Sequence, residues 1–135
     1  MPRKSIQPDT LFPSSQFGFA QIVTSEGNRY VHCAGQTSWD KDMKFIGEGD
    51  LARQMQQSLE NVRLALAAGG ATPKDVVRAT IYVVDYNPEK LEIITGALKA
   101  FFDEDNLPAN TLLGVQSLAL PEFMVEIEVT AVVGG

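Results

Sequence analysis

The sequence predicts a mixed α/β (α+β) domain in which two helices pack on one face of a single β-sheet. Three observations lead to this prediction. Apolar residues recur at helical spacing from Leu51 to Leu66 and again from Leu91 to Phe101. The segments Val76–Val84 and Phe123–Val133 have the β-branched or alternating composition of strands. The predicted order, β-β-(β)-α-β-α-β, places both helices on the same side of a mixed sheet.

The composition indicates one globular domain spanning residues 1–135. Apolar residues make up 44% and charged residues 21% of the chain. A chain of this size buries roughly two-thirds of its unfolded surface, so it needs no disulfide or metal to fold. The net charge of −6 argues against an extended phosphate-binding surface, and we expect no nucleic-acid partner. Cys33 is the only cysteine, which excludes an intrachain disulfide.

Neither a membrane span nor a signal peptide is predicted. No apolar run approaches the roughly 20 residues that cross a bilayer. The basic residues Arg3 and Lys4 are followed by no apolar segment of the kind found in signal peptides. We therefore expect a cytoplasmic protein with no membrane partner.

The first third of the chain predicts short strands and turns. Residues 1–16 contain three prolines and are expected to form an irregular N-terminal arm. Strands are predicted at Phe19–Thr24 and Tyr30–Ala34, with a turn at 26–28 between them. A further short strand is expected near Lys44–Ile46, after a polar turn.

Both predicted helices have recognisable ends. Asp50 is expected to cap the first helix, and Gly69-Gly70 to end it. Asn87 is expected to cap the second helix, with Pro88 at its first position, where the missing N–H group is harmless. The second helix is expected to end at 106–108. The buried stripes are predicted to consist of Leu51, Met55, Leu59, Val62 and Leu66 in the first helix and Leu91, Ile94, Leu98 and Phe101 in the second.

The alternation of side chains along the last predicted strand, Phe123–Val133, distinguishes the two faces of the sheet. One set of alternate side chains is wholly apolar and is expected to lie under the helices, whereas Glu126 and Glu128 point to the opposite face. This second face must meet solvent or another subunit, and we expect Arg78 on it to pair with Glu126 or Glu128. A preceding strand is expected to start near Thr111. The other residues expected on the second face are Thr80, Tyr82, Met124, Thr130 and Val132.

Few residue types point to catalysis by themselves. His32 is the only histidine, so a Ser-His-Asp triad or a histidine-rich metal site is poorly supported, and no metal is expected. We interpret His32 as a strand histidine with a local hydrogen bond, and Cys33 as a small core residue. Glu126 and Glu128 share one strand face. Two close carboxylates can produce a general acid or base, but the residues alone favour a solvated or ion-paired face.

Five short motifs occur in an order that resembles a known family. The motifs are Val31-His-Cys-Ala-Gly-Gln36, Gln57-Ser-Leu-Glu-Asn-Val62, Asp75-Val-Val-Arg-Ala-Thr-Ile-Tyr-Val83, Pro108-Ala109 and Val125-Glu-Ile-Glu128. Each motif is weak alone, but the ordered set resembles the RidA family, also called YjgF, liver perchloric-acid-soluble protein or endoribonuclease L-PSP. The resemblance implies the chorismate mutase-like YjgF fold and a homotrimer with a small-metabolite pocket between subunits.

The best-known activity of the RidA family is hydrolysis of reactive enamines and imines, such as 2-aminoacrylate, to ketoacids and ammonia without a cofactor. In the family, an arginine of a P-A-R-S motif binds the substrate carboxylate and a glutamate of V-E-I-E positions or activates water. The resemblance assigns the catalytic glutamate to Glu126, the glycine of an S-G-Q motif that helps to hold the ligand to Gly35, and an aromatic residue that closes the pocket to Phe19.

The motif at 108–111 departs from the family pattern. It reads Pro-Ala-Asn-Thr, so Asn110 stands where the arginine belongs, and Ala34 stands where many members have serine. A neutral amide cannot supply the fixed charge of a guanidinium, so we expect inefficient turnover of 2-aminoacrylate. The ligand-binding residues that the resemblance implies are Phe19, Ala34, Gly35, Asn110 and Thr111.

Three functions are compatible with these observations. The first is hydrolytic deamination of a different enamine or imine, with Glu126 as the general base. The second is non-catalytic binding of a small metabolite, or a regulatory role, by a trimer that uses the same pocket. The third is the ribonuclease or translation-inhibitor activity attached to some family members, which the acidic charge of −6 and the single histidine disfavour.

Overall fold

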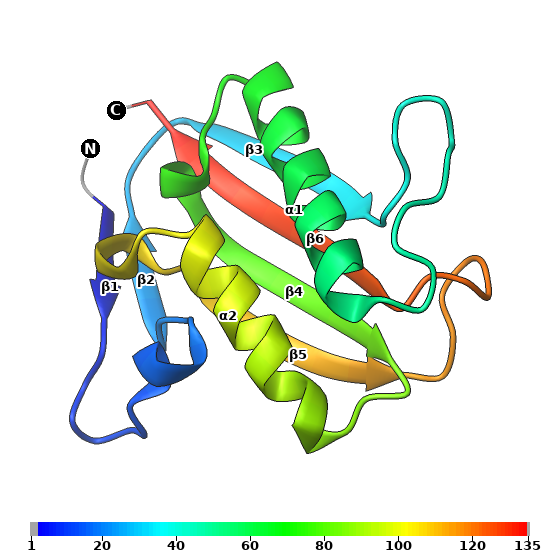
Figure 1. Cartoon of the computed structure of the whole chain (residues 1–135). Helices are drawn as coiled ribbons and strands as arrows, with labels where there is room; N and C mark the ends of the chain where they lie inside the picture. Colours follow the sequence, from blue (N-terminus) through cyan, green and yellow to red (C-terminus); the bar gives the residue numbers. More distant parts are fainter. Residues whose placement is uncertain (1–2, 135) are drawn as a thin grey trace.

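The computed structural model describes residues 3–134 as a four-stranded sheet with two helices across one face and a two-stranded ribbon beside it (Figure 1). The elements are β1 (Arg3–Ile6), β2 (Ile22–Ser25), β3 (Arg29–Gln36), α1 (Leu51–Ala68), β4 (Val76–Val84), α2 (Leu91–Phe101), β5 (Ala109–Val115) and β6 (Val125–Val133). In the larger sheet the order is β3-β6-β4-β5, with β6 antiparallel to both neighbours and β4 parallel to β5. The predicted α+β architecture is confirmed.

The N-terminal arm contains regular structure that the sequence does not predict. An irregular arm is predicted for residues 1–16, but β1 within it pairs antiparallel with β2. Contacts with distant segments fix this ribbon. Arg3 Nη2 donates a hydrogen bond to Val76 O at 2.6 Å, and Ser5 Oγ donates to Leu107 O at 2.7 Å. Sequence periodicity does not reveal such long-range contacts, so this part of the prediction is wrong.

Strands β2 and β3 follow one another in the chain but have different partners. β2 pairs with β1, whereas β3 pairs with β6 in the larger sheet. The ribbon is joined to the larger sheet by an isolated parallel bridge between Ala20 and Ala109. The backbone N–H of Ala20 also donates to Pro108 O at 2.9 Å. This junction brings the segment before β2 against the start of β5.

The segment between β3 and α1 folds through a polar turn. Asp40 Oδ1 accepts a hydrogen bond from Lys44 N–H at 2.9 Å, which closes the turn. Phe45 forms only an isolated bridge with Trp39, so the predicted short strand at Lys44–Ile46 is wrong. Two backbone hydrogen bonds, Asp40 N–H to Lys44 O and Ile46 N–H to Ser38 O, both at 3.0 Å, flank this bridge, so the pairing around the turn is too short to count as a strand.

Helix α1 has the predicted ends. Asp50 adopts an extended conformation, and its Oδ1 accepts a hydrogen bond from Arg53 N–H at 3.0 Å. Gly69 is the C-cap, and Gly70 follows in the left-handed region at φ +82°, where a glycine avoids the strain of a Cβ atom. All five residues of the predicted apolar stripe are buried.

Helix α2 is shorter than predicted. Asn87 Oδ1 accepts a hydrogen bond from Glu89 N–H at 3.0 Å, but this cap starts a 3₁₀ turn, η3 (Pro88–Lys90), and α2 begins after it. The helix ends at Phe101, before the predicted end at 106–108, because Glu104–Asn106 form a separate 3₁₀ turn, η4. Two residues of the predicted stripe, Ile94 and Leu98, are fully buried, and its outer members are half-buried.

The core lies between the two helices and one face of the larger sheet. Figure 1 shows both helices on that face. The last strand divides as predicted, with Val125, Ile127, Val129, Ala131 and Val133 buried beneath the helices. β5 begins at Ala109, slightly before the predicted start near Thr111. In the portion of the chain that the structure describes, no helix is long and apolar enough to cross a membrane.

Candidate functional site

The sheet face without helices carries a hydrogen-bonded polar cluster. The Tyr82 hydroxyl donates to Glu128, and this hydrogen bond raises the pKa of Tyr82. Arg78 Nη2 donates to Thr111 Oγ1 at 2.6 Å. The predicted pairing of Arg78 with Glu126 or Glu128 is wrong. Among residues 3–134, the ion pair within 4.0 Å joins Glu60 and Arg63 of α1, and it does not involve Arg78. The register explains the difference, since Arg78 lies opposite Thr130 on β6 rather than opposite a glutamate.

Glu126 and Gly35 are in direct contact. The pairing of β3 with β6 shifts in register between Cys33 and Gln36, and Gly35 lies within this irregular segment. A Cβ atom at Gly35 would lie only 2.8 Å from the carboxyl carbon of Glu126, closer than real Cβ contacts come. The carboxylate therefore rests directly on the glycine backbone, and any larger residue at position 35 would displace it.

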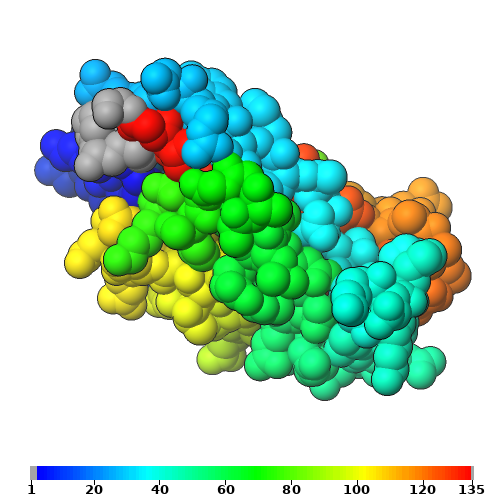
Figure 2. Space-filling model, turned by 90° about the horizontal axis from the view of Figure 1, so that it is seen from above, coloured from blue at the N-terminus to red at the C-terminus, as the bar shows by residue number. Residues whose placement is uncertain are grey.

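Gly35 and Glu126 line an open groove of about 790 Å³ at one end of the sheet. Figure 2 shows the loop that follows β3 (cyan) and the loop between β5 and β6 (orange) together at this end of the molecule. Both loops contribute to the groove, and α1 forms one of its sides. The other lining residues are Gln36, Thr37, Trp39, Asp40, Lys41, Asn61, Leu64, Ala65, Ala119, Leu120 and Phe123. We call this surface the Glu126 groove.

Helix α1 holds the wall of the Glu126 groove through an asparagine. Asn61 Nδ2 donates to Thr37 O at 2.9 Å and to Trp39 O at 2.6 Å, which fixes the loop after β3. Gln57 Nε2 donates to Asn61 Oδ1 at 3.0 Å and orients the amide. Reasoning from residue types missed Asn61 as a site residue. The available signal was the spacing of four between Gln57 and Asn61 in the helix motif, which places both amides on one side of a helix.

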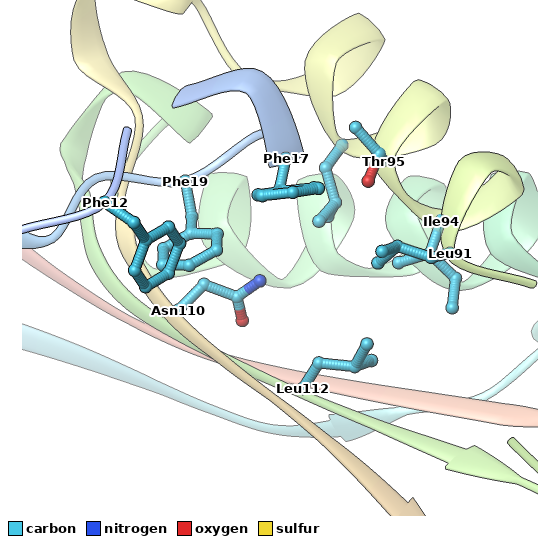
Figure 3. A pocket seen from close by; sticks show the side chains of 9 residues that line it. Phe12, Phe17, Phe19, Leu91, Ile94, Thr95, Asn110 and Leu112 are labelled. Carbon is cyan, nitrogen blue, oxygen red and sulfur yellow. The ribbon is translucent and has the colours of Figure 1, made fainter. Parts of the chain in front are cut away.

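Phe19 and Asn110 line a second, apolar pocket of about 250 Å³ on the helix side of the sheet (Figure 3). It lies between α2, β5 and a 3₁₀ turn, η1 (Ser14–Phe17). The remaining lining residues are Phe12, Phe17, Leu91, Ile94, Thr95, Leu98 and Leu112. We call this cavity the Phe19 pocket.

The residues that the family resemblance implies do not converge in one chain. Asn110 is in register with buried Ala79 and faces the helix side, whereas Glu126 is in register with Tyr82 and faces the opposite side. Thr111 lies on the same face as Glu126, where it accepts the hydrogen bond from Arg78. The structure therefore brings together Gly35 with Glu126 and, separately, Phe19 with Asn110.

Three other residues considered from the sequence, His32, Cys33 and Ala34, lie on β3. Ala34 is exposed, and its carbonyl accepts a hydrogen bond from Gln36 Nε2 at 3.1 Å. His32 is exposed, with its Nδ1 3.2 Å from Thr130 Oγ1, which confirms a strand histidine with a local hydrogen bond. Cys33 is half-buried against the core, and burial raises the pKa of its thiol. Residues 3–134 contain no group of three or more His, Cys, Asp or Glu residues arranged to hold a metal ion.

Comparisons with known proteins agree with this fold. The sequence model of a family described as Endoribonuclease L-PSP matches residues 12–133. The chain is 34% identical over 104 residues to the 2-iminobutanoate/2-iminopropanoate deaminase of Salmonella typhimurium, covering 76% of this chain and 78% of the relative.

Two solved structures extend the comparison. A protein of unknown function of the conserved Rid protein family, YyfB from Yersinia pestis, superposes with a TM-score of 0.95 at 43% identity, covering 98% of this chain and 100% of the other. A member of the YjgF/YER057c/UK114 family from Mycobacterium tuberculosis superposes with a TM-score of 0.65 at 28% identity, covering 97% and 99% of the two chains. The chain therefore belongs to the endoribonuclease L-PSP family, whose members are also named RidA and YjgF.

Proposed function

We propose that this chain hydrolyses a reactive enamine or imine, with Glu126 as the general base, at a site that a second copy of the chain completes. Family membership and the imine deaminase relative at 34% identity support the reaction class. The contact between Gly35 and Glu126 is the observation that carries the proposal. Two separate motifs single out these residues, and they meet in one groove.

The proposed reaction adds water across the C=N bond of the imine, which an enamine reaches by tautomerising. The carboxylate of Glu126 accepts a proton from water as the water oxygen bonds to the imine carbon. That proton passes to the imine nitrogen, which gives a carbinolamine, and the carboxylate then carries the proton of the new hydroxyl group to the amino nitrogen. The C–N bond breaks as the carbonyl forms, and ammonia leaves. Protons and electron pairs balance without a metal or organic cofactor, and none is proposed.

A homotrimer is the proposed assembly. Because Glu126 and Asn110 lie on opposite faces of the sheet, one chain cannot direct both side chains to one ligand. The face without helices also leaves Tyr30 63% exposed and Leu113 44% exposed, which favours its burial by further copies. Light scattering at micromolar concentration should give three times the 14.7 kDa of one chain. A monomer mass would contradict this assembly.

The proposed substrate is an imine other than 2-aminoacrylate. Asn110 occupies the position of the family arginine and carries no charge. Loss of a charge-assisted bidentate contact weakens binding by about 10²- to 10³-fold. We therefore expect 2-aminoacrylate to be hydrolysed far more slowly here than by a relative that has the arginine. Equal turnover by the two proteins would contradict this expectation.

The proposal is tested by measuring hydrolysis of a panel of imines made from neutral and acidic amino acids. Glu126→Gln should lower the rate on the best substrate by about 10²- to 10⁴-fold, because the amide cannot accept the proton. Glu128→Gln on the same strand is the matched control and should retain activity. An unchanged rate in Glu126→Gln would show that the carboxylate is not the base.

Non-catalytic binding is the second candidate function. The Phe19 pocket favours it, because this apolar pocket of about 250 Å³ lies on the face of the sheet away from Glu126. If no imine of the panel reacts faster than it does spontaneously, binding replaces hydrolysis as the conclusion.

A further inference from the structure

The Glu126 groove has an apolar wall that imine hydrolysis by itself does not require. Trp39 lies half-buried on the loop after β3, and Leu64 on α1 is 52% exposed. Leu120, from the loop between β5 and β6, is half-buried and lines the same groove. The two loops lie together at one end of the molecule in Figure 2. Three large apolar side chains on one open surface favour a ligand with a ring that covers them.

Contacts on two sides hold Trp39 in this wall. Its ring meets Phe123 edge to face, with the ring centroids 5.2 Å apart. Its carbonyl accepts a hydrogen bond from Asn61 Nδ2 at 2.6 Å. Phe123 precedes Glu126 by three residues, so their Cα atoms are at most about 11 Å apart. The apolar wall is therefore anchored close to the proposed base.

Lys41 supplies the positive charge of the groove. Among the residues of 3–134 that line it, the charged side chains are those of Asp40, Lys41 and Glu126. Oδ1 of Asp40 accepts hydrogen bonds from the backbone N–H groups of Asp42 and Lys44, each at 2.9 Å. Lys41 is exposed, and in the described part of the chain no carboxylate lies within 4.0 Å of its ammonium group. A ligand carboxylate in the groove therefore has Lys41 as its cation.

The cation and the aromatic part of the wall belong to one turn. Lys41 follows Trp39 by two residues, which limits the distance between their Cα atoms to about 7 Å. The side chain of a lysine is a flexible four-carbon stem, so its ammonium group can reach along the groove. In an α-imino acid with an aromatic side chain, only two carbon atoms separate the ring from the carboxylate. Both groups of such a molecule can meet their partners on this turn at once.

We propose that Lys41 binds the carboxylate of the substrate and that Trp39, Leu64 and Leu120 hold an aromatic side chain beside it. The imine carbon lies between the ring and the carboxylate, where water activated by Glu126 attacks it. The inference rests on the proposed hydrolysis and names the residues that select its substrate. It places the cation on the loop after β3, whereas position 110, where the family has its arginine, carries no charge.

Binding can be measured without turnover, because Trp39 is the only tryptophan of the chain. Its fluorescence is titrated with 3-phenylpropanoate and with the neutral 3-phenylpropanamide, which share a shape and differ in charge. The wild type should prefer the acid. The ratio of acid affinity to amide affinity should fall by about 3- to 5-fold in Lys41→Gln, the contribution of one ion pair near solvent. Lys44→Gln, on the same exposed turn but outside the groove, is the matched control and should keep the wild-type ratio.

The apolar wall is tested with Leu64→Ala, a substitution at an exposed position that should leave the fold intact. It should weaken the binding of both probes by about 3- to 5-fold and leave their ratio unchanged, because it removes apolar contact and no charge. Ile93→Ala on α2, also exposed but outside the groove, is the matched control. In hydrolysis of the imine of phenylalanine, Lys41→Gln should raise KM with kcat nearly unchanged, whereas Glu126→Gln should lower kcat.

Three outcomes would overturn the inference. These are absence of a saturable fluorescence change with either probe in the wild type, an affinity ratio in Lys41→Gln equal to that of the wild type, and an equal fall of the ratio in Lys44→Gln. If the probes bind as expected but no imine is hydrolysed, the hydrolysis proposal fails and the carboxylate site at Lys41 stands. If Glu126→Gln loses hydrolysis while Lys41→Gln keeps the wild-type ratio, hydrolysis stands and the role of Lys41 fails.

Discussion

The Glu126 groove lies at one end of the sheet with α1 along one side, whereas the Phe19 pocket lies on the helix side between α2 and β5, and the two are built by different means. The groove is open and lined by both polar and apolar side chains, and the amides of Asn61 and Gln54 on α1 hold its walls in place. The pocket is smaller and apolar, and its shape depends on the packing of phenylalanine and leucine side chains. A carboxylate near solvent can exchange protons with water, whereas an uncharged amide in an apolar cavity can only bind. We therefore interpret the groove as a site for catalysis and the pocket as a site for binding.

The largest effect is expected on stability, from substitution of Gln54, whose side chain supports the Glu126 groove. Gln54 is fully buried, and its amide makes three hydrogen bonds, to Gly47 O at 3.0 Å, to Glu122 O at 3.1 Å and from Met124 N–H at 2.9 Å. Gln54→Leu removes these three hydrogen bonds and leaves Glu122 O and Met124 N–H without a partner, whereas Gly47 O still accepts from Asp50 N–H. The substitution should lower the free energy of unfolding by about 4 kcal/mol.

Thermal unfolding checks this prediction, because a loss of this size should lower Tm by roughly 10–15 °C in a chain of this length. The same substitution at the exposed Gln56 on α1 is the control and should leave Tm nearly unchanged. If the two variants melt together, buried amides do not hold the groove.

The next effect concerns the contact between Gly35 and Glu126. Gly35→Ala should lower the rate of imine hydrolysis by about 10²-fold, because a methyl group displaces the carboxylate and a displacement of about 1 Å has that consequence. Gly96→Ala is the matched control, since a Cβ atom there meets nothing within 4 Å. Full activity of Gly35→Ala would mean that the contact does not position the base.

A smaller effect is expected when the family arginine is introduced. Asn110→Arg should not restore 2-aminoacrylate hydrolysis, because position 110 points into the apolar pocket within one chain. An arginine there must be redirected toward the Glu126 of a second copy, and a group misplaced by about 1 Å loses about 10²-fold in rate. Burying part of a guanidinium there should lower the free energy of unfolding by about 2 kcal/mol, measured in urea. Asn110→Leu, which keeps the pocket apolar, should be at least as stable as the wild type. Full gain of activity in Asn110→Arg would contradict this expectation.

The smallest effect concerns Cys33, on the core side of the strand that carries Gly35. Burial raises the pKa of its thiol, so the unfolded chain releases this proton first as pH rises. The stabilising contribution is complete below the ordinary thiol pKa of about 8.5 and is lost as pH rises through the higher pKa of the folded state. The urea midpoint should therefore fall more steeply from pH 7.5 to 9.5 in the wild type than in Cys33→Ala. Parallel curves would contradict the prediction.

The sequence by itself determined the helices, the central strands and the buried side of the sheet. Asp50 and Gly69 mark the ends of α1 by local hydrogen bonding and backbone conformation, which depend on neighbours within a few residues. The alternation along β6 likewise specified its buried face, because successive strand residues point to opposite sides. The ordered motifs indicated the family, and the match of the family model to residues 12–133 confirms this prediction.

Only the tertiary structure decided which residues meet. The strand at Arg3–Ile6 depends on contacts with Val76 and Leu107, and the partner of Arg78 depends on register, neither of which periodicity reveals. Sequence motifs named Glu126 and Asn110 together, but their parity along two strands of one sheet sends them to opposite faces. Local hydrogen bonding and alternation act over a few residues, whereas register and burial between distant segments arise only when the whole chain packs.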